Sequence, residues 1–170
     1  KNKYINCHQV EKYNDFVKNS LNIALKPGKL RIYKKNQFLD VTQRQILGIN
    51  PGASYGSAKR WYPEEFAKVA SELSNQYDIV IFGGPGEADI AMDIEKSLIE
   101  NGITNYQNLA GKTTIPELIN HISSLDLFVT GDSGPMHVAA SFKVPTVAIF
   151  GPTKDNETSQ WMNEKSIIVK

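Results

Sequence analysis

The sequence has one cysteine, three histidines and no long apolar run. The lone thiol of Cys7 cannot form an internal disulfide, and a membrane-spanning helix needs about 18 or more consecutive apolar residues. Lys and Arg number 19 against 18 Asp and Glu, and they are scattered along the chain, so neither nucleic acid nor an anionic membrane is expected as the main partner. These absences favour a protein of the reducing cytoplasm.

The chain also lacks the residue patterns of several well-known sites. His8, His121 and His137 lie far apart and no pair of them has ligand spacing, so no metal site is expected. The Gly-rich segment 83–86 lacks the order of a dinucleotide fingerprint. Segment 111–114 ends like a P-loop but lacks the required upstream glycine. Phosphate binding of either of those kinds is therefore excluded.

The first residues lack both an initiator Met and the apolar core of a signal peptide, so we expect the chain to be part of a longer protein. Residues 1–44 are interpreted as an inter-domain connector. Apolar residues at helical spacing predict one helix from Gln9 to Leu25, and Leu30 to Tyr33 predicts a short strand. This connector either packs on the main domain or belongs to a neighbouring one.

From residue 45 to residue 170 the pattern predicts one α/β domain. Buried-type strands alternate with amphipathic helices, which indicates a Rossmann-like parallel sheet with helices on both faces. The expected strands are Ile46–Ile49, Asp78–Phe82, Tyr106–Leu109, Leu127–Thr130 and Val147–Phe150, and the expected helices are Pro63–Leu73, Glu87–Glu100, Ile115–Ile122 and Met136–Phe142. In such sheets ligands bind beyond the carboxyl ends of the strands, so the loops at 50–61, 83–87, 110–114, 131–137 and 151–153 should share one edge.

The turn at residues 131–137 leads from a strand into a helix and is the main candidate site. Ser133 is expected to cap the helix, which leaves backbone N–H groups of the first turn for an anion such as phosphate. Asp132 would then accept hydrogen bonds from ligand hydroxyls, a combination that suggests a phosphorylated sugar. Ser133 lies outside any G-x-S-x-G motif, so a serine hydrolase is excluded. His137 either donates to the phosphate or is a packed histidine.

Three other loops carry candidate ligand groups. In the long loop 50–61, Ser54 and Ser57 offer hydroxyls and Lys59 suits a phosphate, although a solvated surface lysine is the alternative. Glu87 is either a favourable charge at a helix start or an acceptor for ribose hydroxyls. Lys112 and Thr113 should face the same rim. The residue after them, Thr114, is expected to cap the next helix with Glu117 as its partner.

Five motifs, in this order and spacing, resemble one enzyme family. They are G-A-S-Y-G-S-A-K-R-W (52–61), F-G-G-P-G-E (82–87), N-L-A-G-K-T (108–113), G-D-S-G-P-M-H-V-A-A (131–140) and F-G-P-T (150–153). Together they resemble the C-terminal half of the ADP-heptose:lipopolysaccharide heptosyltransferases of glycosyltransferase family 9, most closely the heptosyltransferase II members. The resemblance implies the donor-binding domain of a two-domain GT-B fold.

The resemblance also implies a role for each matching residue. Lys59 corresponds to a lysine that contacts the donor phosphates, with Ser54 and Ser57 in the same loop. Glu87 would lie near the ribose, Thr113 near the adenosine with Lys112 beside it, and Asp132 would hold heptose hydroxyls. Ser133, Gly134 and Met136 would line the diphosphate, and His137 would complete that turn.

The implied reaction is inverting transfer of heptose from ADP-heptose to the inner core of lipopolysaccharide or lipooligosaccharide, without cofactor or metal. The lipid A–core acceptor and the catalytic base would belong to an N-terminal domain outside this chain, so we expect residues 1–170 to bind donor without transferring sugar. The resemblance allows peripheral association with the cytoplasmic face of the inner membrane. The alternatives are a donor domain for another nucleotide sugar and a non-catalytic nucleotide-sugar binding module.

Overall fold

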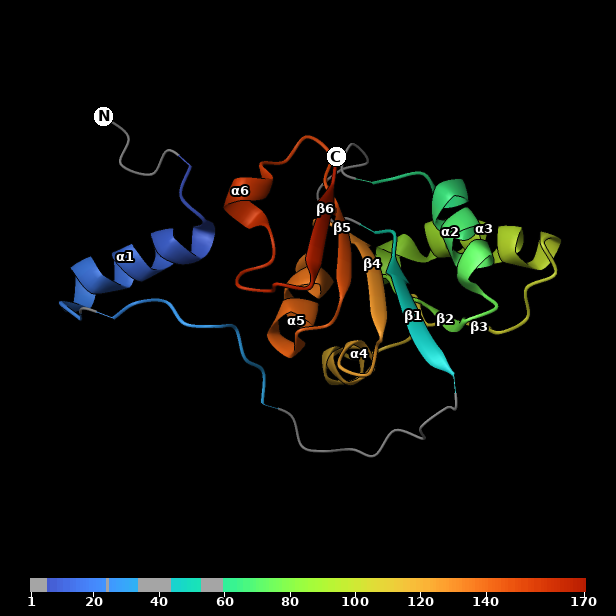
Figure 1. Cartoon of the computed structure of the whole chain (residues 1–170), viewed down its shortest axis with the longest axis horizontal. Helices are drawn as coiled ribbons and strands as arrows, with labels where there is room; N and C mark the ends of the chain where they lie inside the picture. The colour runs from blue at the N-terminus through green and yellow to red at the C-terminus, as the bar shows by residue number, and fades with distance from the viewer. Residues whose placement is uncertain (1–5, 24, 34–43, 53–59) are drawn as a thin grey trace.

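The computed structural model describes residues 6–23, 25–33, 44–52 and 60–170 and contains one parallel α/β sheet with its helices (Figure 1). The elements in chain order are α1 (Gln9–Leu21), β1 (Gln45–Asn50), α2 (Pro63–Leu73), β2 (Tyr77–Ile81), the short 3₁₀ helix η2 (Pro85–Glu87), α3 (Ala88–Glu100), β3 (Tyr106–Asn108), α4 (Ile115–Ile122), β4 (Leu127–Gly131), α5 (Gly134–Phe142), β5 (Thr146–Ile149), α6 (Asp155–Thr158) and β6 (Ser166–Val169).

All six strands pair in parallel in the order β3-β2-β1-β4-β5-β6. The chain moves from β1 outward to β2 and β3, then returns to β4 on the other side of β1. The point where the strand order reverses, between β1 and β4, is where ligands bind in sheets of this kind. The predicted parallel α/β class is confirmed.

Helices cover both faces of the sheet, as the alternating pattern predicted. One apolar cluster joins α2 and α3 to the sheet and includes Leu47, Ile49 and Phe66. A second cluster, with Phe82 and Phe128, lies on the opposite face under α4 and α5. Figure 1 shows these two helix pairs on the two sides of the sheet. The strands are apolar on both faces because both faces are packed.

Local sequence signals explain where the helices begin. At α4 the Thr114 hydroxyl accepts the Glu117 N–H and the Glu117 carboxylate accepts the Thr114 N–H, so the predicted capping box is confirmed. At α2 the first residue is Pro63, whose missing N–H is not needed there. Both helices have the bounds predicted from the sequence.

Three expectations at the two ends of the chain are wrong. Helix α1 ends at Leu21, before the predicted Leu25, because Asn22 adopts a left-handed conformation with φ 53° that closes the helix. Residues 30–33 form no strand, since the six-stranded sheet offers them no pairing partner. Helix α6 and strand β6 were not anticipated: a single helical turn is too short to show a period, and the apolar residues of β6 were not used as a strand signal.

The connector packs on the main domain through the segment around α6. His8 is the N-cap residue of α1, and its Nδ1 accepts the Val10 N–H at 3.1 Å. The proton of the ring is therefore on Nε2, which donates to the Ser159 carbonyl at 2.9 Å. The His8 ring also lies 4.7 Å from the Trp161 ring, measured between centroids. The start of α1 therefore contacts the main domain at Ser159 and Trp161. The interpretation of residues 1–44 as a connector stays a prediction.

Two kinds of site are absent from the described residues: a membrane-spanning helix and a cluster of metal ligands. No helix there has the length and apolar composition needed to cross a membrane. No group of three or more His, Cys, Asp or Glu side chains in the described ranges could hold a metal ion.

Candidate functional site

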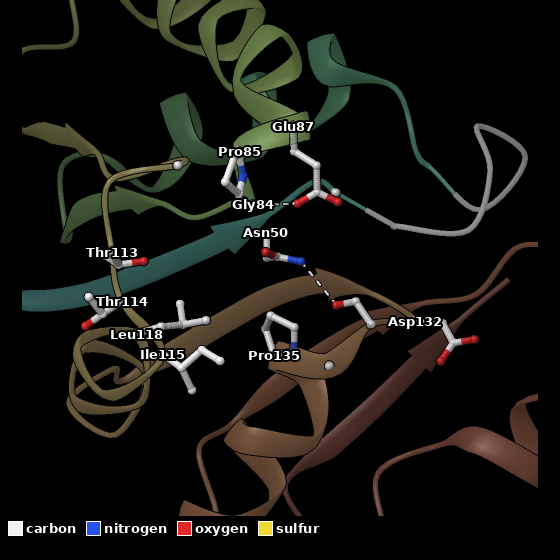
Figure 2. Close-up of a pocket in the computed structure, with 15 residues that line it drawn as sticks. Asn50, Gly84, Pro85, Glu87, Thr113, Thr114, Ile115, Leu118, Asp132 and Pro135 are labelled. Atoms are coloured by element: carbon white, nitrogen blue, oxygen red, sulfur yellow. Dashed lines mark hydrogen bonds between the residues drawn. The ribbon is translucent and has the colours of Figure 1, made fainter.

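A cavity of about 380 Å³ opens at the carboxyl ends of β1, β2, β3 and β4 (Figure 2). Four loops contribute to its wall, as expected from the topology of the sheet. Its lining residues are Asn50, Gly52, Gly83, Gly84, Pro85, Glu87, Gly111, Thr113, Thr114, Ile115, Leu118, Asp132, Ser133, Gly134 and Pro135. The predicted meeting of the loops at 50–52, 83–87, 110–114 and 131–137 is therefore observed. Ser54, Ser57 and Lys59 lie outside the described residues.

Glu87 forms one wall of the cavity, and its carboxylate is held by the preceding turn. Oε2 of Glu87 accepts the Gly84 N–H at 2.7 Å, which fixes the side chain at the start of α3. The same carboxylate lies against Gly52, where the missing Cβ leaves room for it. The interpretation of Glu87 as a charge at a helix start agrees with this geometry. Its proposed contact with a ribose stays a prediction.

Asp132 lies at the end of the cavity away from Thr113 and Thr114 (Figure 2). The Thr158 hydroxyl of α6 lies 3.4 Å from Oδ2 of Asp132 and donates to it. The carboxylates of Asp132 and Glu87 thus belong to different walls of one cavity. A ligand with hydroxyl groups at two separated positions would match this arrangement.

The prediction that the Ser133 side chain caps α5 is wrong. Ser133 occupies the N-cap position with an extended backbone, but its hydroxyl accepts no N–H from the first turn. Instead, Nδ2 of Asn50 donates to Ser133 Oγ at 3.1 Å, and the Ser133 hydroxyl lies 3.3 Å from the Gly131 carbonyl. The Asn50 amide, and not a backbone N–H of the first turn of α5, is therefore the donor to Ser133 Oγ. The end of β1 brings Asn50 beside this turn.

Met136 and His137 are not among the residues that line this cavity. The Met136 side chain is fully buried with Ala148 and Phe150 on the α5 face of the sheet. His137 is partly buried, and that burial lowers the pKa of its imidazole, as does the nearby His8, while Asp132 acts in the opposite direction. The pKa change favours the neutral imidazole, which donates a hydrogen bond without adding a positive charge.

The predicted site residues Lys112 and Thr113 are neighbours in sequence, but their side chains lie on different sides of the loop. Thr113 lines the cavity. Lys112 turns to the other side, where Nζ donates to the Asn108 carbonyl at 3.0 Å and the side chain lines a different, more open hollow beside β3. The structure therefore brings Thr113, Glu87, Asp132, Ser133 and Gly134 together, and it leaves Lys112 outside.

Several lining residues were missed by the sequence analysis as individual site residues. Asn50 and Gly52 were noted only as members of a long loop, although a polar Asn at the end of an apolar strand is a usable signal. Ile115 and Leu118 of α4 give the cavity an apolar wall, and the Ile115 side chain is 74% exposed. The exposed apolar wall suits a flat or apolar part of a ligand.

The chemistry of the cavity follows from these groups. The first turn of α5 offers backbone N–H groups with the positive end of the helix dipole, which favours an anion. Ser133 and Thr113 add hydroxyls, the two carboxylates accept hydrogen bonds from hydroxyls, and α4 adds the apolar surface. An anionic ligand that also carries hydroxyls and an apolar ring system would use every wall.

Comparison with known proteins agrees with this chemistry. The family profile described as glycosyltransferase family 9 (heptosyltransferase) matches residues 2–170. Lipooligosaccharide heptosyltransferase 2 of Campylobacter jejuni is 48% identical to this chain. The match covers 99% of this chain and 54% of the Campylobacter jejuni protein. Lipopolysaccharide heptosyltransferase 2 of Escherichia coli is 34% identical, with 80% of this chain and 39% of that protein covered.

Solved structures give the same result. The structure of E. coli ADP-heptose lps heptosyltransferase II superposes with a TM-score of 0.71 at 28% identity, covering 94% of this chain and 43% of that one. The chain therefore spans about half the length, or less, of the relatives that it matches. The resemblance stated from the five motifs, including its heptosyltransferase II part, is confirmed.

Proposed function

The chain belongs to glycosyltransferase family 9, the heptosyltransferases, and from that premise we propose that residues 45–170 are the donor-binding domain of an inverting heptosyltransferase. The intact enzyme transfers heptose from ADP-heptose to the inner core of lipopolysaccharide or lipooligosaccharide. Residues 1–44 are the connector from an N-terminal domain that binds the lipid A–core acceptor. The relatives support this division, since this chain covers 54% of the Campylobacter jejuni protein.

One observation carries the proposal: the start of α5, Glu87 and Asp132 belong to a single cavity at the point where the strand order reverses. The diphosphate of the donor binds at the start of α5, where N–H groups, the helix dipole and the Ser133 hydroxyl stabilise its charge. Glu87 accepts from the ribose, and Asp132 accepts from the heptose hydroxyls. These two carboxylates lie on different walls of the cavity, as a nucleotide diphosphate sugar requires.

The adenine is the part of the donor that suits the apolar wall. Ile115 and Leu118 line the cavity next to Thr113 and Thr114, and Ile115 is largely exposed. Burying that side chain under a purine removes apolar area from water, which contributes about 25 cal/mol for each Å². These features support a donor orientation with the adenosine near the start of α4 and the sugar near Asp132.

In the reaction, an acceptor hydroxyl attacks the anomeric carbon as ADP leaves, and the base that removes the hydroxyl proton comes from the N-terminal domain. The donor-binding domain, residues 45–170, binds the ADP leaving group and stabilises its growing negative charge. The N–H groups of α5 and the Lys59 ammonium serve that role. His137, outside the cavity lining, and Lys112, which donates to the Asn108 carbonyl, are not assigned a part in this step.

Nucleotide selectivity tests the proposal. Calorimetric titration with ADP, UDP and GDP should give the tightest binding for ADP, and ADP-heptose should bind at least as well. A preference for UDP or GDP would favour a donor domain for another nucleotide sugar. Purified 1–170 should bind donor and transfer no heptose, so transfer by this chain alone would contradict the division of labour between the two domains.

The cellular place of the enzyme follows from its two substrates. ADP-heptose is a charged, water-soluble donor, and the acceptor is a lipid, so we infer action at the cytoplasmic face of the inner membrane. Fractionation of cells that produce the intact protein checks this inference. Recovery in the cytosol or loosely on inner membranes is expected, and recovery with the outer membrane would contradict it.

A further inference from the structure

Asn50 is the last residue of the central strand β1 and lies at the floor of the cavity. Its side chain is only 2% exposed, and it lies opposite Thr130 in the register of β1 and β4. Figure 2 shows it between the Glu87 wall and the α5 wall, with its amide directed toward the α5 turn. A buried amide at that place needs hydrogen-bond partners, because burying it without them is unfavourable.

The partners of the Asn50 amide are two hydroxyl oxygens. Nδ2 donates to Ser133 Oγ at 3.1 Å and to Thr130 Oγ1 at 3.3 Å. Both hydroxyls have the Gly131 carbonyl as an acceptor, at 3.3 Å from Ser133 and 3.1 Å from Thr130. Asn50 donates to Ser133 Oγ, so the proton of that hydroxyl must point away from Asn50. Its neighbours there are the Gly131 carbonyl at 3.3 Å and Thr130 Oγ1 at 3.4 Å. Both distances are long for a hydroxyl donor, so a better acceptor can replace these contacts.

This arrangement matters because few backbone donors are available at the start of α5. Pro135 has no N–H, and the Met136 N–H already donates to the Ser133 carbonyl at 3.2 Å. Among the first three residues of α5, the Gly134 N–H is therefore the backbone donor that can meet an anion. A Ser133 hydroxyl that faces the anion would add a second donor at this place.

We propose that Asn50 is a positioning residue for donor binding: its amide donates to the Ser133 hydroxyl oxygen and holds that hydroxyl beside the start of α5, so that Ser133 donates its proton to the diphosphate. The inference rests on the proposed function, because it requires a diphosphate at α5. Asn50 acts on the diphosphate through Ser133.

A double-mutant cycle on the intact polypeptide tests the coupling. We expect Asn50→Ala and Ser133→Ala each to weaken ADP binding about tenfold, as for a lost hydrogen bond to a charged group. The double variant should bind ADP no more weakly than Ser133→Ala alone, since Asn50 has nothing left to orient. Adenosine, which lacks phosphate, should bind all four proteins equally. Additive losses, or equal losses for adenosine, would overturn the proposal.

Two further variants separate positioning from a structural role. Asn50→Asp keeps the shape but turns the donor into an acceptor, so it should weaken ADP more than Asn50→Ala does. Asn50→Gln keeps the donor and should restore part of the affinity. If Asn50→Ala does not fold, Asn50→Asp and Asn50→Gln test the proposal instead. Equal ADP affinity of these two variants would contradict a positioning role for Asn50.

The matched control is Asn105. Its amide also donates to other residues, namely the Ser74 and Tyr77 carbonyls and Oδ1 of Asp78, but at the amino ends of the strands. Asn105→Ala should lower the melting temperature and leave ADP affinity unchanged. If the unsubstituted protein does not bind ADP, the proposed function fails together with the role of Asn50. If it binds ADP and the cycle is additive, the role of Asn50 fails alone.

Discussion

The carboxylate of Glu87 lies directly over Gly52, two residues beyond the end of β1. A Cβ added at Gly52 would overlap Cδ and both carboxylate oxygens of Glu87. Real atoms do not approach so closely, so any side chain at Gly52 must displace the Glu87 carboxylate. The position of a candidate ribose acceptor therefore depends on a glycine from another loop.

Gly52→Ala should weaken ADP binding by about 1 to 2 kcal/mol, because it moves Glu87 out of the cavity wall. Stability should change little, since the displaced atoms are the end of a flexible side chain. Calorimetry with ADP and thermal melting measure the two effects.

The matched control for this change is Gly86→Ala in the neighbouring turn, where an added Cβ meets nothing within 4 Å. In a Glu87→Ala background the Gly52 substitution should have no further effect on ADP affinity. A full additional loss there would show that Gly52 acts by some route other than Glu87.

Asp132→Asn should separate the sugar from the nucleotide. The substitution removes a negative charge near the diphosphate, so ADP should bind equally well or more tightly. The amide is a poorer acceptor for sugar hydroxyls, so ADP-heptose should lose about 1 to 3 kcal/mol relative to ADP. Parallel titrations with both ligands measure the difference, and an equal loss for the two would refute a sugar-specific role.

His137 should make stability depend on pH. Burial lowers the pKa of its imidazole below the ordinary 6.5, an effect to which His8 adds and which Asp132 opposes. Between that lowered value and about 6.5 the unfolded chain binds more protons, so stability is present above pH 6.5 and falls as the pH drops. Melting temperatures across this range should fall less steeply for His137→Gln than for the unsubstituted protein. Identical slopes would count against this explanation.

The connector should loosen when its anchor is removed. His8→Ala deletes the N-cap acceptor of α1, the hydrogen bond to the Ser159 carbonyl and the ring contact with Trp161. A lost N-cap costs about 1 kcal/mol, so amide exchange in α1 should become faster while that in β1 stays unchanged. Lys18→Ala, an exposed substitution in the last turn of α1, provides the control. Unchanged exchange in His8→Ala would contradict the anchoring role.

Most of the fold could be predicted because its signals are local. Apolar runs such as Ile46–Ile49 predict buried strands, and the spacing of Phe66 and Ala70 predicts a helix that packs on them. The alternation of the two, together with the general rule for parallel sheets, also placed the site at the correct edge. Helix α6 was missed because one helical turn does not establish a period, and strand β6 because its short apolar run was not used as a strand signal.

The sequence by itself determined the class of the fold, the edge of the sheet that carries the site and, through five ordered motifs, the family. Only the tertiary structure decided how individual side chains are used. Asn50 donates to the Ser133 hydroxyl although 83 positions separate the two residues, and Gly52 makes room for Glu87. Met136 is buried in the core although the three residues before it line the cavity. The physical reason is that strand and helix formation depend on nearby residues, whereas hydrogen bonds and close approaches depend on which distant loops the sheet brings together.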